Sequence, residues 1–287
     1  MSEISVIPKE MFQPLADVAI TLIDKLSCVA GFIVTPKGKR KDREDAVAFL
    51  VDEIKSNSTM PPMAKAAAIS EARRMLKKYS NQNDIINMAM EQLSEDAHPE
   101  TVDNDWIEEF LDRTENVSKE DLKYIFAKIL AEECEHNGSI SKRLLSILAI
   151  MNSNYANYFK KICKYLIVSK DTQGNVELLL IVRNINDLSK APVHLAYNKI
   201  EELSNIGLLN IAQNGEYISD PPIDEFTYGD FRYKVNKIPQ EGCFIGQLSL
   251  TDVGQELANI LVRECEVGYE LKLETYFKSR GYEIERI

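Results

Sequence analysis

The sequence predicts a mainly α protein with a C-terminal α+β module of the winged-helix type. Apolar residues recur at helical spacing as far as about residue 170, and short runs typical of strands follow. Helix start and stop signals are dense between residues 105 and 151. We therefore expect a helical region over residues 1–97, a helical bundle over 98–170 and a winged-helix-like domain over 171–287.

The first apolar stretch, residues 15–34, is expected to form an amphipathic, buried helix. Its charged residues Asp17, Asp24 and Lys25 would be costly at the centre of a bilayer, so we expect no stable membrane insertion. Interfacial membrane binding is the alternative, and only the basic run at residues 37–43 favours it. A solvated loop is the favoured explanation of that run.

A long helix is predicted over residues 63–93, where apolar residues follow heptad spacing as in a coiled coil. The candidate oligomer seam consists of Ile69, Leu76, Tyr79, Asn83, Ile86 and Met90. A polar residue such as Asn83 in a seam fixes register or oligomeric state. Asn83→Leu should then stabilise the protein and broaden its oligomeric distribution. The alternative is that the helix packs on its own neighbours and that Asn83 is satisfied locally.

Residues 105–151 predict three consecutive helices. Ser118 is the expected N-cap of the second helix, which should end at Asn137-Gly138. Ser139 or Ser141 should cap the third. A candidate anion contact lies at this point, where serine hydroxyls and basic side chains meet a helix N-terminus. It comprises Ser139, Ser141, Lys142 and Arg143. The simpler interpretation is that the serines only cap the helix.

The C-terminal module is predicted from a helix over residues 192–206, Gly207, a strand over 208–211 and the step Leu250-Thr-Asp-Val-Gly254. This order is typical of a winged helix with a long wing over residues 214–244. The candidate contacts to DNA or a protein partner are Tyr197, Asn198 and Lys199 in the helix and Arg232 and Lys234 in the wing. The helix also carries two glutamates, which would repel phosphates, so protein contact is the alternative.

Charge is distributed unevenly along the chain. The formal net charge of −11 argues against non-specific coating of nucleic acid. Residues 94–121 hold eleven acidic and two basic side chains, whereas residues 122–170 hold eight basic and three acidic ones. Further basic clusters lie at residues 37–43 and 73–78. A solvated surface is the simplest interpretation of these clusters. Binding of a local anionic partner is the more specific alternative.

No catalytic constellation is evident, so we expect a non-enzymatic protein without a cofactor. The five cysteines include no CxxC pair, which indicates reduced thiols and a cytoplasmic location. Cys134 and His136 lack the further ligands that zinc requires, and Glu132, Glu133 and Glu135 read as a solvated helix end. Phosphate-loop, dinucleotide-binding and nucleophile-elbow motifs are absent from the sequence.

Several segments resemble an uncharacterised bacterial family known only as domain of unknown function number 2806. They include Asp105-Trp-Ile-Glu-Glu-Phe110, Ala127-Lys-Ile-Leu-Ala-Glu-Glu133 and, most specifically, Gly138-Ser-Ile-Ser-Lys-Arg143. The resemblance covers most of the chain and is strongest over residues 106–159. It implies a bacterial cytosolic protein and carries no activity. Genes of such families often lie among mobile-element or phage-defence genes, which is an association only.

Two functions are therefore expected. The first is a regulatory or interaction protein whose helical half oligomerises or docks a partner, and whose winged-helix-like module contacts DNA or protein, with phage defence as one expected setting. The second is a toxin-like effector of a stress or phage-defence response that acts on a cellular target or a membrane.

Overall fold

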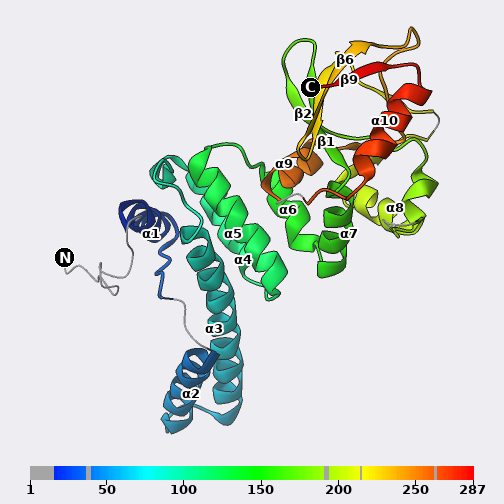
Figure 1. Ribbon diagram of the computed structural model, residues 1–287. Coiled ribbons are helices and arrows are strands. Elements are labelled where there is room, and N and C mark those ends of the chain that lie inside the picture. Colours follow the sequence, from blue (N-terminus) through cyan, green and yellow to red (C-terminus); the bar gives the residue numbers. More distant parts are fainter. Residues whose placement is uncertain (1–15, 37–39, 191–193, 214, 262–263) are drawn as a thin grey trace. The chain divides into compact units, whose positions relative to one another are not determined.

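Figure 1 shows the computed structural model, which describes residues 16–36, 40–190, 194–213, 215–261 and 264–287. The chain divides into two compact units, Met1–Ile150 and Met151–Ile287. The described part of the first unit is built from helices, and the second unit combines helices with antiparallel sheet. The expected mainly α chain with a C-terminal α+β part is confirmed at this level. The expected division into three regions stays a prediction.

Among the described helices of the first unit, the third is the longest. The helices of this unit are α1 (Ala16–Ala30), α2 (Arg40–Ser56), α3 (Pro62–Met90), the short 3-10 helix η2 (Pro99–Thr101), α4 (Asn104–Thr114), α5 (Glu120–Glu135) and α6 (Lys142–Ile150).

The two halves of α3 have different environments. Its buried residues all lie in the C-terminal half, from Asn81 onward, where α5 packs along it. The N-terminal half packs against α2 instead (Figure 1). Pro62 at the first helical position and a run of alanines favour helix here without tertiary support. We call α2, the turn after it and residues 62–78 of α3 the arm.

The core of the first unit contains a row of aromatic rings on α4 and α5. Trp106 stacks on Phe110 with ring centroids 5.3 Å apart, and Phe110 meets the edge of Phe126 at 6.1 Å. Asp103 caps α4, since its side chain accepts a hydrogen bond from the Trp106 N–H at 2.9 Å. The predicted grouping of Trp106 and Phe110 on one helical face is thus used to build the core.

The predicted caps are partly correct. Ser141 caps α6, because its Oγ accepts a hydrogen bond from the Leu144 N–H at 3.1 Å. The prediction that Ser118 is the N-cap of α5 was wrong. The helix begins at Glu120, and Lys119 occupies the cap position without making a side-chain capping hydrogen bond.

The second unit alternates short strands with helices. Its elements are α7 (Ser153–Cys163), β1 (Leu166–Asp171), β2 (Val176–Leu180), η3 (Ile185–Ser189), α8 (Tyr197–Asn205), β3 (Leu209–Ile211), β4 (Tyr217–Ile218), β5 (Ile223–Tyr228), β6 (Phe231–Lys237), β7 (Phe244–Gly246), β8 (Leu248–Leu250), α9 (Asp252–Ile260), α10 (Tyr269–Ser279) and β9 (Glu283–Arg286). Helical structure was expected as far as residue 170, but β1 already begins at Leu166.

A five-stranded antiparallel sheet with the order β2-β1-β5-β6-β9 forms the main layer of this unit. Two smaller pairs, β3-β8 and β4-β7, accompany it. Residues 214–244 were expected to form a long wing, but β5 and β6 within that range are inner strands of the large sheet. Their alternating apolar residues must be buried, which a solvated wing would not allow.

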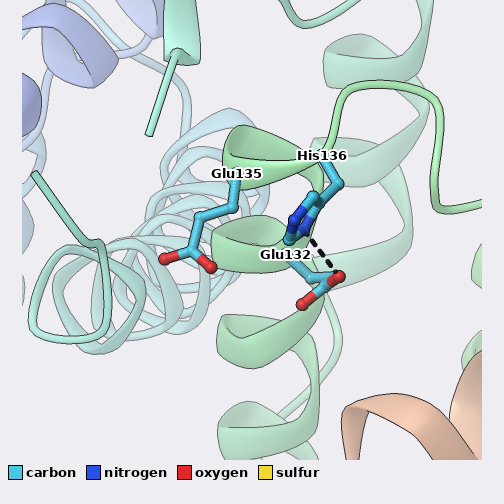
Figure 2. A group of neighbouring side chains, drawn as sticks. All are labelled: Glu132, Glu135 and His136. Atoms are coloured by element: carbon cyan, nitrogen blue, oxygen red, sulfur yellow. Dashed lines mark hydrogen bonds and ion pairs between the residues drawn. The ribbon is translucent and has the colours of Figure 1, made fainter. Parts of the chain in front are cut away.

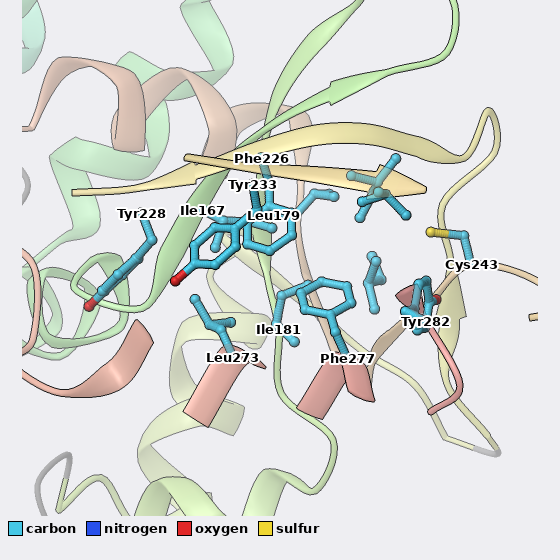
Figure 3. Packing of buried hydrophobic residues seen from close by; sticks show 13 residues of the cluster. Ile167, Leu179, Ile181, Phe226, Tyr228, Tyr233, Cys243, Leu273, Phe277 and Tyr282 are labelled. Atoms are coloured by element: carbon cyan, nitrogen blue, oxygen red, sulfur yellow. The ribbon is translucent and has the colours of Figure 1, made fainter. Parts of the chain in front are cut away.

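The core of the second unit lies between the large sheet and α10 (Figure 3). Phe226 on β5 stacks on Tyr233 of β6, with centroids 4.7 Å apart, and on Phe277 of α10, at 4.8 Å. Leu273 on the same helix is buried against this cluster. Burying side chains of this size contributes about 1.5–3 kcal/mol each, so this contact holds α10 on the sheet.

Candidate functional site

The α8 residues expected to contact DNA are only partly free to do so. Tyr197 and Asn198 are exposed at the start of the helix. The Lys199 Nζ instead donates to Glu202 at 2.7 Å and lies 5.5 Å from the centre of the Tyr158 ring. The hydrogen bond to Glu202 raises the pKa of Lys199. The cation expected to meet phosphate is therefore already paired with an acid.

The two other expected contacts, Arg232 and Lys234, lie on β6 in the large sheet. Each reaches across to β5: Arg232 pairs with Glu225 at 2.6 Å, and Lys234 pairs with Asp224 at 2.8 Å. They do not belong to a wing, since β6 is an inner strand of the sheet. Their charges are balanced by neighbouring carboxylates, which weakens their suitability for a nucleic-acid backbone.

The loop expected to hold an anion is occupied by a carboxylate of the chain itself. Glu133 is buried, and its two oxygens accept the N–H groups of Gly138, at 2.7 Å, and Ile140, at 2.9 Å. Burial raises the pKa of Glu133 despite these two hydrogen bonds. The Trp106 indole donates to the Ile140 carbonyl at 2.9 Å and fixes the loop from the other side.

The four residues of this expected anion contact take different positions. Ser141 caps α6, and the Ser139 hydroxyl is buried without a hydrogen-bond partner among the described residues. Lys142 lies 4.0 Å from Asp103, and Arg143 is exposed. Because Glu133 already accepts the loop N–H groups, this site serves to fix the loop.

The candidate oligomer seam of α3 is divided between two environments. Asn83, Ile86 and Met90 are buried within the unit, so a second chain cannot reach them. Ile69, Leu76 and Tyr79 are half-buried. The residues with heptad spacing thus lie on one face of α3. This face packs against α2 in the N-terminal half of the helix and against the core of the unit in the C-terminal half.

The polar residue in this seam binds the chain's own backbone. The Asn83 side chain accepts the Thr35 N–H at 2.8 Å, and Asn87 donates to the Thr35 carbonyl at 2.9 Å. One turn earlier, the Tyr79 hydroxyl donates to the Ile33 carbonyl at 2.9 Å. These three side chains, four residues apart along α3, grip the extended segment 33–35. Their spacing was visible in the sequence, but the segment that they bind was not.

Three possible metal ligands meet at the end of α5 (Figure 2). One ligand atom each from Glu132, Glu135 and His136 lies within 4.8 Å of the others. All three groups already have partners, because His136 Nδ1 is 3.0 Å from Glu132 and Glu135 accepts the Ser94 N–H at 3.0 Å. The trio is only partly buried, and a structural zinc site needs a fourth ligand, so it is a weak candidate.

A further candidate site of the first unit is a cavity of about 520 Å³ at the base of the arm. Its polar lining comes from α2, α3, α5 and the segment just before α5, and includes Arg43, Arg73, Lys77, Ser80, Ser118 and Lys123. The structure therefore brings together one residue from the basic run at 37–43, two from the cluster at 73–78 and one from the basic segment 122–170. Sequence analysis identified these three segments and did not place them together.

Fold and site define a class of protein: a helical unit with a projecting arm and a basic cavity, followed by an α+β unit. The model of the family described as "Protein of unknown function (DUF2806)" matches residues 69–274, and the chain belongs to this family. The resemblance noted in the sequence is thereby confirmed. No curated protein and no solved structure is significantly similar to the chain.

Proposed function

We propose that the protein is a non-enzymatic interaction or regulatory protein that self-associates through its arm. The observation that carries this proposal is the unburied apolar surface of the arm. Phe49 is 66% exposed, Met63 86% and Met75 60%. These side chains lie on two helices that pack against each other, and burying each of them in an interface would contribute about 1.5–3 kcal/mol.

A second copy of the arm is the occupant that its charges favour. Residues 44–53 of α2 carry four acidic and no basic side chains, whereas residues 62–78 of α3 carry five basic and one acidic. In a two-fold arrangement, the same patch on each chain contacts the other, so α2 of one copy can lie against α3 of the next. Acidic and basic surfaces then face each other in both halves of the interface.

Light scattering over a range of concentrations tests this proposal. We expect the wild-type chain to dimerise and Phe49→Glu and Met75→Glu to remain monomeric. Leu271→Glu is the matched control, because Leu271 is similarly exposed, at 63%, but lies on α10 in the second unit. A wild-type chain that stays monomeric at every concentration would refute self-association.

The winged-helix interpretation of the module around α8 forms part of the proposal. In its support, β3 and β8 pair antiparallel between α8 and α9. Thr251 donates to the Gly207 carbonyl at 2.6 Å and caps α9. A protein surface is the favoured target, because Lys199 is paired with an acid. Duplex DNA binding that is sensitive to salt and lost in Lys199→Glu would instead establish a DNA target.

The effector alternative has less support than assembly through the arm. Its membrane-acting version relied on an apolar face of residues 15–34 that could lie on a membrane, whereas action on another cellular target stays a prediction. In the structure Leu22 and Leu26 of α1 are fully buried within the first unit. Among the described residues, no helix is both long and apolar enough to cross a bilayer.

A further inference from the structure

We propose that the cavity at the base of the arm binds an organic phosphate of nucleotide size. Its volume of about 520 Å³ lies within the range of small-molecule sites. Three helices that are separate in the sequence contribute cations to it: Arg43 from α2, Arg73 and Lys77 from α3, and Lys123 from α5. Convergence of cations from separate elements distinguishes this site from a charged face of one helix.

The cations of α3 that line the cavity differ from their neighbours on the same helix, which are paired with acids. Arg74 pairs with Glu71 at 2.8 Å, and Lys78 pairs with Glu115. Arg73 and Lys77, which line the cavity, have no acidic partner within ion-pair distance in the part of the chain that the structure describes. The two cations that face the cavity are therefore available to an external anion.

Around Lys123, the cavity lining keeps one excess negative charge, because a single lysine faces the two carboxylates of Asp84 and Glu120. The Lys123 side chain is only 6% exposed, and its Nζ lies 2.6 Å from Asp84 and 3.1 Å from Glu120. These two acidic groups line the same cavity but are engaged by Lys123. The charge left for a ligand comes from Arg43, Arg73 and Lys77, so the site presents net positive charge although the whole chain is acidic.

Neutral donors complete an environment suited to phosphate. The hydroxyls of Ser80 and Ser118 line the cavity, and Arg43 Nη1 lies 3.5 Å from the Ser80 hydroxyl. Arginine offers paired N–H groups that match phosphate oxygens. In addition, α5 begins beside Ser118, and no side chain caps its first turn. Glu120 and Asp121 lie in that turn and offset the positive end of the helix, so the positive field of the site comes from Arg43, Arg73 and Lys77.

An adjoining cavity indicates what the phosphate would be attached to. This second space, of about 310 Å³, shares Arg43, Ser80 and Asp84 with the first. Its other lining residues include Pro36, Leu76 and Tyr79, which make it more apolar. A ligand that fills both spaces carries a phosphate at one end and a less polar group at the other. A nucleoside monophosphate has this chemistry and this size.

Calorimetric titration of the full-length chain tests the proposal, with adenosine 5′-monophosphate, adenosine and inorganic phosphate as probes. We expect the nucleotide to bind more tightly than inorganic phosphate, and adenosine to bind weakly. Arg73→Gln and Lys77→Gln should each weaken nucleotide binding about 10- to 100-fold, the effect of one charge-assisted hydrogen bond. Arg74→Gln, one residue away, is the matched control and should change binding little.

Three results would overturn the proposal. The first is the absence of heat for both phosphate probes at millimolar concentration. The second is equal weakening by Arg73→Gln and Arg74→Gln, which would indicate a diffuse surface field. The third is tight binding of duplex DNA that the nucleotide does not displace. Phe49→Glu should leave nucleotide binding unchanged, so that failure of this proposal is distinguishable from failure of arm association.

Discussion

The grip of α3 on residues 33–35 gives the sharpest test of the structure. Asn83→Ala removes the side-chain oxygen that accepts the Thr35 N–H at 2.8 Å. Asn83 is only 4% exposed, so water replaces this acceptor poorly. Losing a buried hydrogen bond and leaving its donor unsatisfied costs about 1–3 kcal/mol. Alanine has a better helix propensity than asparagine, which offsets this loss of stability by roughly a few tenths of a kcal/mol.

Urea denaturation followed by tryptophan fluorescence measures this loss. Trp106 is the single tryptophan of the chain and is buried in the first unit, so its emission reports that unit alone. With a urea dependence of about 1–3 kcal/mol per molar, a loss of ~2 kcal/mol lowers the midpoint by about 1 M. Ser70→Ala, at an exposed position of the same helix, measures the propensity gain and should leave the midpoint almost unchanged.

Two further variants decide between the grip and an intermolecular seam. If Asn83 sat in a seam between chains, Asn83→Leu would raise the midpoint; the grip on Thr35 requires that it fall. Asn87→Ala should also destabilise the unit, because Asn87 donates to the Thr35 carbonyl at 2.9 Å. The double variant should lose less than the sum of the two single losses, since both side chains act on one residue. A stabilising Asn83→Leu would refute this reasoning.

Three other predictions concern the loop at Glu133 and the step at Thr251. Burial raises the pKa of Glu133, so the folded unit holds this proton more tightly than the unfolded chain. Its contribution to stability should therefore be greatest at acidic pH and decline as pH rises from about 4.5 through the raised folded pKa. Urea midpoints of wild type and Glu133→Gln across this range should show the decline in the wild type only; parallel curves would contradict it. Thr251→Val removes the cap of α9 and the hydrogen bond to the Gly207 carbonyl, and should cost about 1–2 kcal/mol by thermal melting monitored by near-ultraviolet dichroism. Thr275→Val, at an exposed position of α10, is its control. Gly254→Ala should be still more harmful in the same assay, because a Cβ would lie 2.1 Å from the Leu208 carbonyl oxygen, and an unchanged melting temperature would show that this approach is looser than described.

Much of the helical half was predictable because its signals are local. The heptad pattern located α3, and Ser141 and Gly138 marked the boundary between α5 and α6. The function of Asn83 was not predictable, since its partner Thr35 lies 48 residues away. An asparagine in an apolar seam looks the same whether its partner is another chain or a distant backbone segment. Only the tertiary contact distinguishes the two.

The second unit shows a similar division. The turn at Gly207 and the step to Gly254 were visible, but residues 214–244 between them were assigned to a wing. Strand pairing depends on partners that are remote in sequence, and β5 and β6 join β1 and β9 in one sheet. This pairing also brought Arg232 and Lys234 within ion-pair distance of acids of β5, which no local pattern indicated.

The sequence by itself determined the helical class, the family resemblance and the three basic segments around Arg43, Arg73 and Lys123. These properties depend on composition, on spacing along one helix and on short motifs. The tertiary structure decided which charges remain available. It paired Lys199, Arg232 and Lys234 with acids, filled the serine loop with Glu133 and brought cations of three helices to one cavity. Electrostatic interactions depend on distance in space, and separation along the chain does not fix that distance.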